Sequence, residues 1–282
     1  MHTDDYCRER AARRGASLHY SLLFTADTTR RRLLALHAVR HDLCAIESEC
    51  SDIQLARLKL QWWRDELQRA ASGMPQHPAV QALCASVAPD ALPLSDLLTL
   101  IDNLETALTT ISLPTTEALL HHCRGIGGLT GALAVKLSSA RNAATPQHGV
   151  LLGTALQFLD LLFHLRADAA RDRLLLPRDA LADSRVTAAD LRGTGSNDAV
   201  VALLRAQIEI ARQLFNDALH QLPADDRWSQ HHGMIMAQLH LTLLDSLATD
   251  PTSLLRERVT LPAWRKLWIA WRTASGARRA TS

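Results

Sequence analysis

Three ionisable residues recur at helical spacing inside an apolar segment of the chain. Asp160, His164 and Asp168 stand four residues apart, so on a helix their side chains share one stripe. The positions between them are mostly apolar, so most of this helix is expected to be buried: Leu159, Leu161, Leu162, Phe163 and Leu165. An unpaired buried carboxylate is very costly. The stripe should therefore face a partner, water or a ligand, unless it pairs with Arg166 and Arg171 on its own helix.

The remainder of the chain also favours helices. Leu, Ala and Arg are abundant and alternating runs of Val, Phe or Tyr are scarce, which is typical of helical proteins. Apolar residues make up 47% of the 282 residues, enough for a large core. Residues 51–72 are amphipathic, with Leu55, Leu58, Trp62 and Leu67 at the apolar positions. No linker divides the chain, so we expect one all-α domain over residues 1–273 and a disordered basic tail over residues 274–282.

Charge, cysteine content and hydropathy narrow the classes of function. The net charge is only +2, which gives no reason to expect nucleic-acid binding. The five cysteines lack C-x-x-C spacing and indicate reduced thiols in a cytosolic setting. The first residues are polar, unlike a signal peptide, and no apolar run reaches the roughly 18 residues that cross a bilayer. We therefore expect a cytoplasmic protein, with a peripheral position at the inner membrane face as an extension of that expectation.

Several segments resemble, in order and spacing, the squalene/phytoene synthase family. Leu152-Gly153, Gln157, Asp160, Asp168 and the run Arg173–Pro177 follow that family's second aspartate-rich signature without a gap. Earlier matches are Ser17–Ser21, Leu36–Val39, Trp63–Leu67, His77–Val80, and Cys123 with Gly128 and Gly131. The resemblance implies an isoprenoid-synthase-type helical bundle around a central cavity. It also implies head-to-head condensation of two prenyl diphosphates, with carboxylates binding Mg²⁺ and Mg²⁺ holding the diphosphate.

The same resemblance assigns roles to particular residues. The positions that match the family's diphosphate- and substrate-binding residues are Gln157, Asp160, His164, Asp168, Arg173 and Tyr20. Asp160 and Asp168 are the candidate Mg²⁺ ligands, with Glu47 as a further candidate. The implied ligand is an isoprenoid diphosphate or a related lipid. No residue is assigned a catalytic role.

The departures from the family pattern fall on the metal ligands. The first motif, D-D-x-x-D, aligns with Cys44–Ser48, where all three aspartates are absent. Glu47 and Glu49 are two residues apart and point to different sides of a helix. In the second motif His164 replaces an aspartate, and imidazole suits Zn²⁺ or Cu²⁺ better than Mg²⁺. The positions of the family's asparagine, arginine and tyrosine hold Asp160, Phe163 and Leu175. We therefore predict an impaired Mg²⁺–diphosphate site, as in a pseudoenzyme.

This pattern of loss is similar to that of certain mitochondrial assembly factors for respiratory complex I, which look like phytoene synthases with degenerate aspartate motifs. Ala35–Val39 and Leu60–Trp63 resemble segments of those factors. The resemblance implies an isoprenoid-binding or assembly-type factor with a protein partner and little or no transferase activity. The alternative is an active Mg²⁺-dependent prenyltransferase whose metal site uses Asp160, Asp168, Glu47 or Glu49 in an unusual geometry.

A second candidate metal site lies on the helix expected after residue 28. His37, His41 and Cys44 stand at i, i+4 and i+7, a spacing that suits Zn²⁺ by ligand type. Core packing of single histidine and cysteine residues explains the same pattern and is the favoured interpretation.

The C-terminal segment alternates tryptophan with basic residues. On a helix, Trp264, Leu267, Trp268 and Trp271 form one apolar face with arginines at its edge. Such a face suits a peripheral contact with a membrane interface. Docking of this face against the domain's own core explains the same pattern, and the sequence favours docking.

Overall fold

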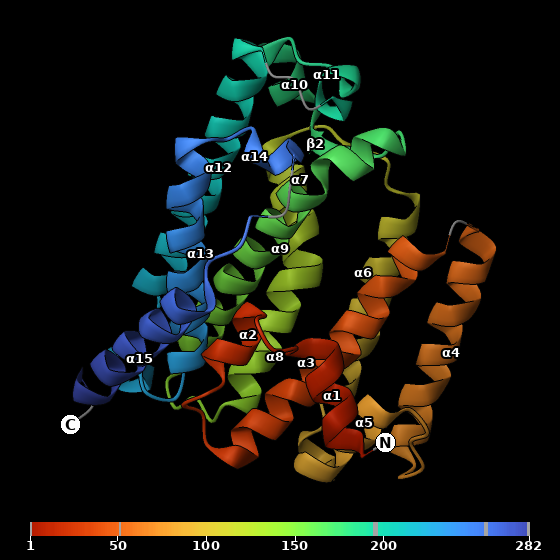
Figure 1. Cartoon of the computed structure of the whole chain (residues 1–282). Coiled ribbons are helices and arrows are strands. Elements are labelled where there is room, and N and C mark those ends of the chain that lie inside the picture. The colour runs from red at the N-terminus through yellow and green to blue at the C-terminus, as the bar shows by residue number, and fades with distance from the viewer. Residues whose placement is uncertain (1, 51, 194–196, 257–258, 281–282) are drawn as a thin grey trace.

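The structure is a computed structural model that describes residues 2–50, 52–193, 197–256 and 259–280. Helices make up most of it (Figure 1). The elements are α1 (Thr3–Ala11), α2 (Ser17–Ser21), α3 (Asp27–Glu49), α4 (Ile53–Ala71), α5 (Pro78–Ser86), η1 (Pro89–Ala91), α6 (Leu94–Thr109), β1 (Ser112–Leu113), α7 (Thr116–Cys123), η2 (Arg124–Gly128), α8 (Leu129–Leu137), α9 (Thr145–Ala170), β2 (Leu174–Pro177), α10 (Arg178–Ser184), α11 (Ala188–Arg192), α12 (Asp198–His220), η3 (Ala224–Asp226), α13 (His231–Thr249), α14 (Ser253–Arg256) and α15 (Ala263–Ala280).

Helix α9 runs through the middle of the molecule, with α12 and α13 on one side and α8 on the other (Figure 1). It begins with Pro146 in its first turn, where a missing N–H costs nothing. Asp226 accepts hydrogen bonds from the N–H groups of Arg141 and Asn142 and from the Thr145 hydroxyl, and so fixes the start of the helix. Although α9 is long and apolar enough to cross a membrane, half of its most apolar stretch is buried. It is the core helix of the bundle.

Two clusters of buried apolar side chains stand on either side of the α8–α9 contact. One joins α9 with α12, α13 and α15 and contains the fully buried Phe158 and Phe215. The other joins α3 to α6 with α1 and α8 and contains Leu36 and Leu100. A helical bundle with two packed halves leaves room for a cavity between them.

Glycine pairs bring α8 and η2 against α9 at backbone contact. A Cβ atom added to Gly131 would lie 1.8 Å from the carbonyl oxygen of Gly149. One added to Gly127 would lie 2.2 Å from the carbonyl oxygen of Gly153. No other residue fits at such distances. Residues Arg124–Gly128 form a π-helical turn at this contact.

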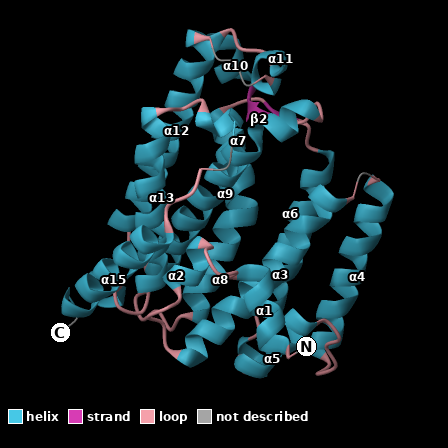
Figure 2. Ribbon diagram, viewed as in Figure 1, coloured by secondary structure: helices cyan, strands magenta, loops and turns pink. Residues whose placement is uncertain are grey.

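The all-α class is confirmed, with one short addition. Strands β1 and β2 pair in parallel, with Ser112 opposite Leu174 and Leu113 opposite Pro177 (Figure 2). All four residues of β2 are buried. This pairing fixes the position of Arg173, which directly precedes β2.

Three expectations differ from the structure, and the first concerns the buried face of α4. In α4 the buried positions are Ala56, Leu60, Trp63, Leu67 and others, whereas Leu55, Leu58 and Trp62 are exposed. The two tryptophans are adjacent, so only one of them can face the core, and the Trp63 ring packs against His77 with ring centroids 4.6 Å apart.

The predicted disordered tail from residue 274 is the second difference, because α15 continues to Ala280. Ala274 and Ala277 are buried against the domain, which stabilises the last turns of the helix. The predicted docking of the tryptophan face is also wrong. The helix docks through its opposite face, and Trp264, Trp268 and Trp271 are 72%, 51% and 55% exposed.

Candidate functional site

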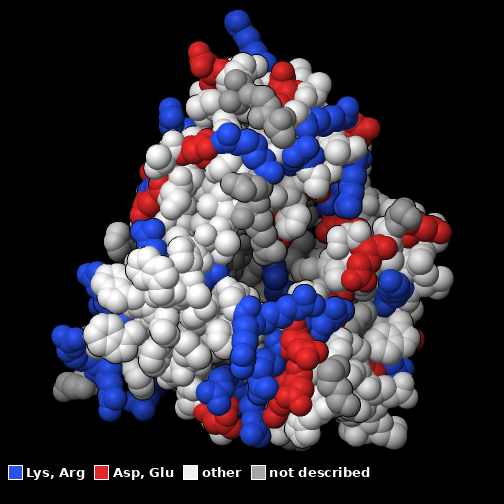
Figure 3. Space-filling view, in the orientation of Figure 1, with Lys and Arg blue, Asp and Glu red and all other residues white. Residues whose placement is uncertain are grey.

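A cavity of about 760 Å³ lies between the two halves of the bundle. Helices α3, α8, α9 and α13 line it, together with residues that precede α2 and α15. Figure 3 shows the surface hollowed near the centre of the view, over the position of α9 in Figure 1. Its apolar wall includes Leu152, Leu156, Phe163, Met236 and Leu243. A volume in the range of roughly 300–1,000 Å³ is typical of small-molecule sites.

Basic residues outnumber acidic ones around this cavity. Arg10, Arg13, Arg40 and Lys266 line it, and Asp160 is the one acidic residue among the described lining residues. The Arg10 Nε atom donates to the buried Asp42 carboxylate at 2.7 Å. The Lys266 ammonium donates to the carbonyl oxygen of Gly15 at 2.6 Å, tying the C-terminal helix to the loop before α2. The cavity therefore combines an apolar wall with a net positive charge.

Arg40 connects the cavity to the family-like stripe of α9. Its guanidinium donates to Gln157 Oε1 at 2.7 Å, and Gln157 is buried. One turn further along α9, Asp160 lines the cavity and keeps a side chain that is 55% exposed. Of the residues predicted to bind substrate, the structure thus places Asp160 in the cavity lining and Gln157 behind it, bonded to Arg40.

Three of the other predicted residues, Arg173, Glu47 and Asp168, form an ion cluster near β2. Arg173 forms an ion pair with Glu47 of α3. Its guanidinium also donates to the carbonyl oxygens of Thr110 at 3.0 Å and Ala107 at 3.3 Å, beside the end of α6. Burial raises the pKa of Glu47; Arg173 opposes that shift and Asp168 adds to it. Burial also raises the pKa of Asp168, against the positive charge of Arg173.

His164 turns towards its own helix. Its Nδ1 atom lies 2.8 Å from the backbone carbonyl oxygen of Asp160, so this nitrogen carries the proton that is donated. The side chain is 60% exposed. A carboxylate of Asp160 lies 3.9 Å from the same nitrogen. The imidazole therefore pairs within α9 and reaches solvent.

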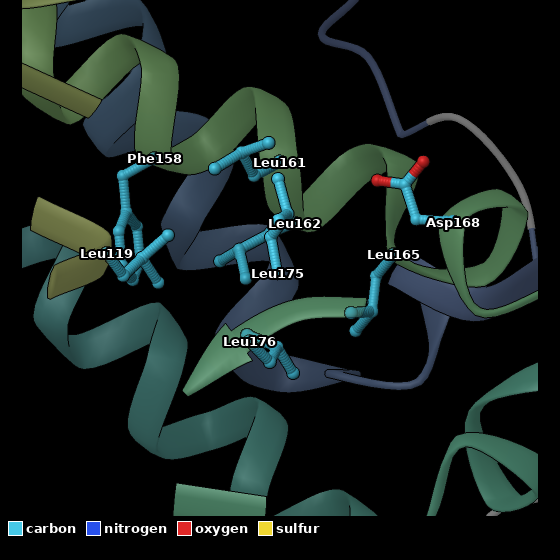
Figure 4. Close-up of a pocket in the computed structure, with 8 residues that line it drawn as sticks. All are labelled: Leu119, Phe158, Leu161, Leu162, Leu165, Asp168, Leu175 and Leu176. Carbon is cyan, nitrogen blue, oxygen red and sulfur yellow. The ribbon is translucent and has the colours of Figure 1, made fainter. Parts of the chain in front are cut away.

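Apolar side chains of α7, α9 and β2 pack together beside Asp168. Figure 4 shows the side chains of Leu119, Phe158, Leu162, Leu175 and Leu176 gathered between α9 and β2, with Asp168 at the end of the group. The space they leave is about 10 Å³, which is about the size of a single water probe. Leu175 stands where the family carries a tyrosine, so no hydroxyl group is present there.

Tyr20 lies beside the cavity without lining it. The Lys266 ammonium sits 5.9 Å from the centre of its ring, a cation–π distance. The ring also packs edge to face with His19 at 5.2 Å between centroids. In this arrangement Tyr20 supports the lysine that faces the cavity.

The side chains of the two predicted metal sites lie in differing surroundings. Within residues 2–50, 52–193, 197–256 and 259–280, no three His, Cys, Asp or Glu side chains converge as metal ligands would. His37 lines the cavity, His41 is 44% exposed beside Asp42, and burial raises the pKa of the Cys44 thiol. Zn²⁺ binds cysteine as the thiolate, which burial disfavours here.

Sequence reasoning missed a group of buried imidazoles at the cavity. His148 and His232 line it and are almost fully buried. Burial lowers the pKa of His232 to about 3 and that of His37 to about 4. The His148 Nδ1 atom lies 2.6 Å from the carbonyl oxygen of Ala218, which leaves its Nε2 atom as an acceptor. These residues lie far apart in sequence, so no spacing could have grouped them.

Comparison with known proteins shows which family the chain is similar to. A family profile described as squalene/phytoene synthase matches residues 11–265. The chain is 25% identical to the 15-cis-phytoene synthase of Synechococcus elongatus, over 93% of this chain and 89% of that protein. It is 26% identical to the presqualene diphosphate synthase of Sinorhizobium fredii, over 76% of this chain and 77% of that protein.

Two solved structures share the fold. The squalene synthase HpnC of Alicyclobacillus acidocaldarius superposes with a TM-score of 0.72 at 21% identity, covering 88% of this chain and 93% of the other. A dehydrosqualene synthase with bound ligand superposes with a TM-score of 0.76 at 17% identity, covering 98% of this chain and 97% of the other.

Proposed function

The chain belongs to the squalene/phytoene synthase family, and we propose that it binds an isoprenoid lipid in the central cavity without condensing prenyl diphosphates. The observation that carries this proposal is the ion pair between Arg173 and Glu47. In the family resemblance these two residues belong to the diphosphate-binding segment and to the first metal motif. Here each is the other's partner.

The cavity supports the binding part of the proposal. Its wall is built from leucine, methionine and phenylalanine side chains, which match an isoprenoid chain. Arg10, Arg13, Arg40 and Lys266 give it the charge that attracts a phosphate or another anionic head group. Backbone contacts between glycines of α8 and α9 fix the positions of these two helices, so the cavity keeps its shape without a ligand.

The donor set supports the loss of condensation. Mg²⁺ needs several oxygen ligands in near-octahedral geometry. The first-motif segment offers Cys44, Ala45 and Ser48 where carboxylates are needed, and Glu47 is paired. On α9, Asp160 lines the cavity and Asp168 lies beside Glu47 and Arg173, eight residues further along the helix. These residues do not fit the Mg²⁺–diphosphate group that the family implies.

The energetic consequence is large. Fixed charges that stabilise a departing group contribute several kcal/mol, which corresponds to several orders of magnitude in rate. A bound diphosphate without that stabilisation stays intact. An assembly-type role with a protein partner, in the cytoplasm or at the inner membrane face, is consistent with a protein that presents a lipid and does not convert it.

The second candidate is an active head-to-head prenyltransferase. It is favoured by Asp160 at the cavity wall and by the retained Asp168 and Arg173. In that case Asp160, Asp168 and Glu47 would hold Mg²⁺, which would supply the positive charge for the departing diphosphate. The relatives named 15-cis-phytoene synthase and presqualene diphosphate synthase also favour this candidate.

One experiment separates the two candidates. Purified protein is incubated with labelled farnesyl or geranylgeranyl diphosphate, Mg²⁺ and NADPH, and products are extracted into organic solvent. We expect no C30 or C40 hydrocarbon and saturable retention of the label on the protein. A C30 or C40 product that disappears in Asp168→Ala would establish the prenyltransferase instead.

A further inference from the structure

Helix α15 presents a continuous apolar stripe to solvent. Trp264, Leu267, Trp268 and Trp271 stand at i, i+3, i+4 and i+7, so they fall along one face. Each of the four is between 48% and 72% exposed. The opposite face packs on the domain through Ile269, Ala270, Ala274 and Ala277. The helix is therefore held in place by small residues while its largest side chains point outwards.

Positive charge borders this stripe. Exposed Arg265 and Arg272 flank it, Arg278 and Arg279 follow at the end of the helix, and α15 contains no acidic residue. The Arg272 guanidinium lies 5.2 Å from the centre of the Trp268 ring. In Figure 3 the area over α15 shows uncharged side chains with basic ones at its edge. Three tryptophans with arginines and no carboxylate are complementary to the interface of an anionic bilayer.

We propose that the tryptophan face of α15 docks the protein onto the surface of an anionic phospholipid bilayer. The helix lies in the plane of the interface, with Trp264, Trp268 and Trp271 in the head-group region and the arginines against lipid phosphates. This surface is separate from the cavity lining, and its role does not depend on which ligand the cavity binds.

The docked orientation also places the cavity close to the bilayer. Lys266 lies on the inner side of α15 and lines the cavity, as do Val259, Thr260 and Leu261 just before the helix. The same short segment therefore has a lipid-facing side and a cavity-facing side. An apolar molecule would pass between bilayer and cavity beside α15, without crossing the width of the protein.

Helix α4 also exposes an apolar stripe, but the charges around that stripe differ from those around the stripe of α15. On α4, Leu55, Leu58 and Trp62 are also exposed. Basic residues of that helix are paired with carboxylates, since Arg64 pairs with Asp102 and Glu105 and Arg69 pairs with the buried Glu66. The Arg69 guanidinium also lies 5.4 Å from the centre of the Trp62 ring. Mixed charge of this kind gives no preference for an anionic surface. Trp62 is therefore a matched control, because it is exposed, aromatic and distant from α15.

The test is flotation of the full chain with phosphatidylcholine vesicles, with and without phosphatidylglycerol. We expect binding to the anionic vesicles that falls as salt rises. The variant Trp264→Ser/Trp268→Ser/Trp271→Ser and the variant Arg265→Gln/Arg272→Gln should each bind at least about tenfold more weakly. Trp62→Ser should bind like the unmodified protein. Thermal unfolding checks that all variants remain folded.

Quenching of tryptophan fluorescence by brominated lipids locates the contact. Quenching in Trp62→Ser and its absence in the triple variant would place α15 in the bilayer. The proposal fails if the unmodified protein does not float with anionic vesicles, or if the triple variant floats equally well. It also fails if the triple variant instead converts a dimer to a monomer in analytical ultracentrifugation, because α15 would then bind a second copy of the chain.

Discussion

The guanidinium of Arg173 pairs with the carboxylate of Glu47, joining the segment before β2 to the end of α3. Both side chains are mostly buried, with 21% and 29% of their surfaces exposed. The same guanidinium binds two backbone carbonyls near the end of α6. One residue thus holds three segments together at the position where the family resemblance expects diphosphate binding.

Removal of this guanidinium should destabilise the fold. Arg173→Met leaves the Glu47 carboxylate without its partner and two carbonyls without a donor, at a cost of about 2 kcal/mol in the free energy of unfolding. The pKa of Glu47 is already raised, and loss of Arg173 raises it further. A raised carboxyl pKa removes stability as the pH rises, so the cost should be larger at pH 7 than at pH 5. Urea unfolding at both values measures it, and Glu47→Gln/Arg173→Met should recover part of the loss.

The glycine contact between α8 and α9 should tolerate no side chain. Gly131→Ala places a Cβ atom 1.8 Å from the Gly149 carbonyl oxygen, so the helices must separate. We expect a loss of about 3 kcal/mol or more in the free energy of unfolding. Gly276→Ala on α15 is the control, because nothing lies within 4 Å of its added Cβ. That change should stabilise by about 0.5–1 kcal/mol. Equal effects at the two sites would contradict the packing described.

The buried imidazoles should make the fold sensitive to acid. The pKa of His232 is lowered to about 3 by burial, whereas an unfolded histidine titrates near 6.5. Between these values the unfolded chain binds more protons, so stability falls as the pH is lowered. From pH 7 to pH 5 this one residue should cost up to about 2 kcal/mol. His232→Asn should show a shallower dependence on pH in urea unfolding; an unchanged slope would exclude His232 as the cause.

Filling the cavity should block ligand binding. Met236 lines the cavity, and Met236→Trp replaces its thioether chain with a bulkier indole ring in that space. Met234 lies two residues earlier on α13 and is outside the lining, so Met234→Trp is the matched control. Titration with a farnesyl or geranylgeranyl lipid should give at least about tenfold weaker affinity for Met236→Trp only. The same affinity in both variants would place the ligand elsewhere.

The sequence predicted the helical class and α9 because period and order along the chain carry that information. It could not predict how the α9 stripe divides. Asp160 and Asp168 are separated by about 12 Å along a helix axis, so their nearest neighbours on other elements differ. Asp160 lines the cavity and Asp168 joins Glu47 and Arg173. The partner of Glu47 is distant in sequence, and no local spacing indicates it.

The face of α15 was ambiguous for a different reason. Its tryptophan stripe and its alanine stripe both have helical period, and size alone favours burial of the tryptophans. The structure buries Ala270, Ala274 and Ala277, because small residues allow the helix to lie close to its neighbours. A hydrophobic pattern in the sequence indicates which residues are apolar. It does not indicate how much space the surface that packs against the helix leaves for their side chains.

The backbone contact between Gly131 and Gly149 sets the separation of two cavity walls without using any residue of the polar stripes. The shape of the interior is therefore independent of its chemistry. Residues of the polar stripes can be exchanged, lost or paired with a neighbouring charge while the enclosed volume is kept. In a scaffold of this kind, substitutions in the polar residues change the chemistry of the interior and leave its dimensions as the backbone contact sets them.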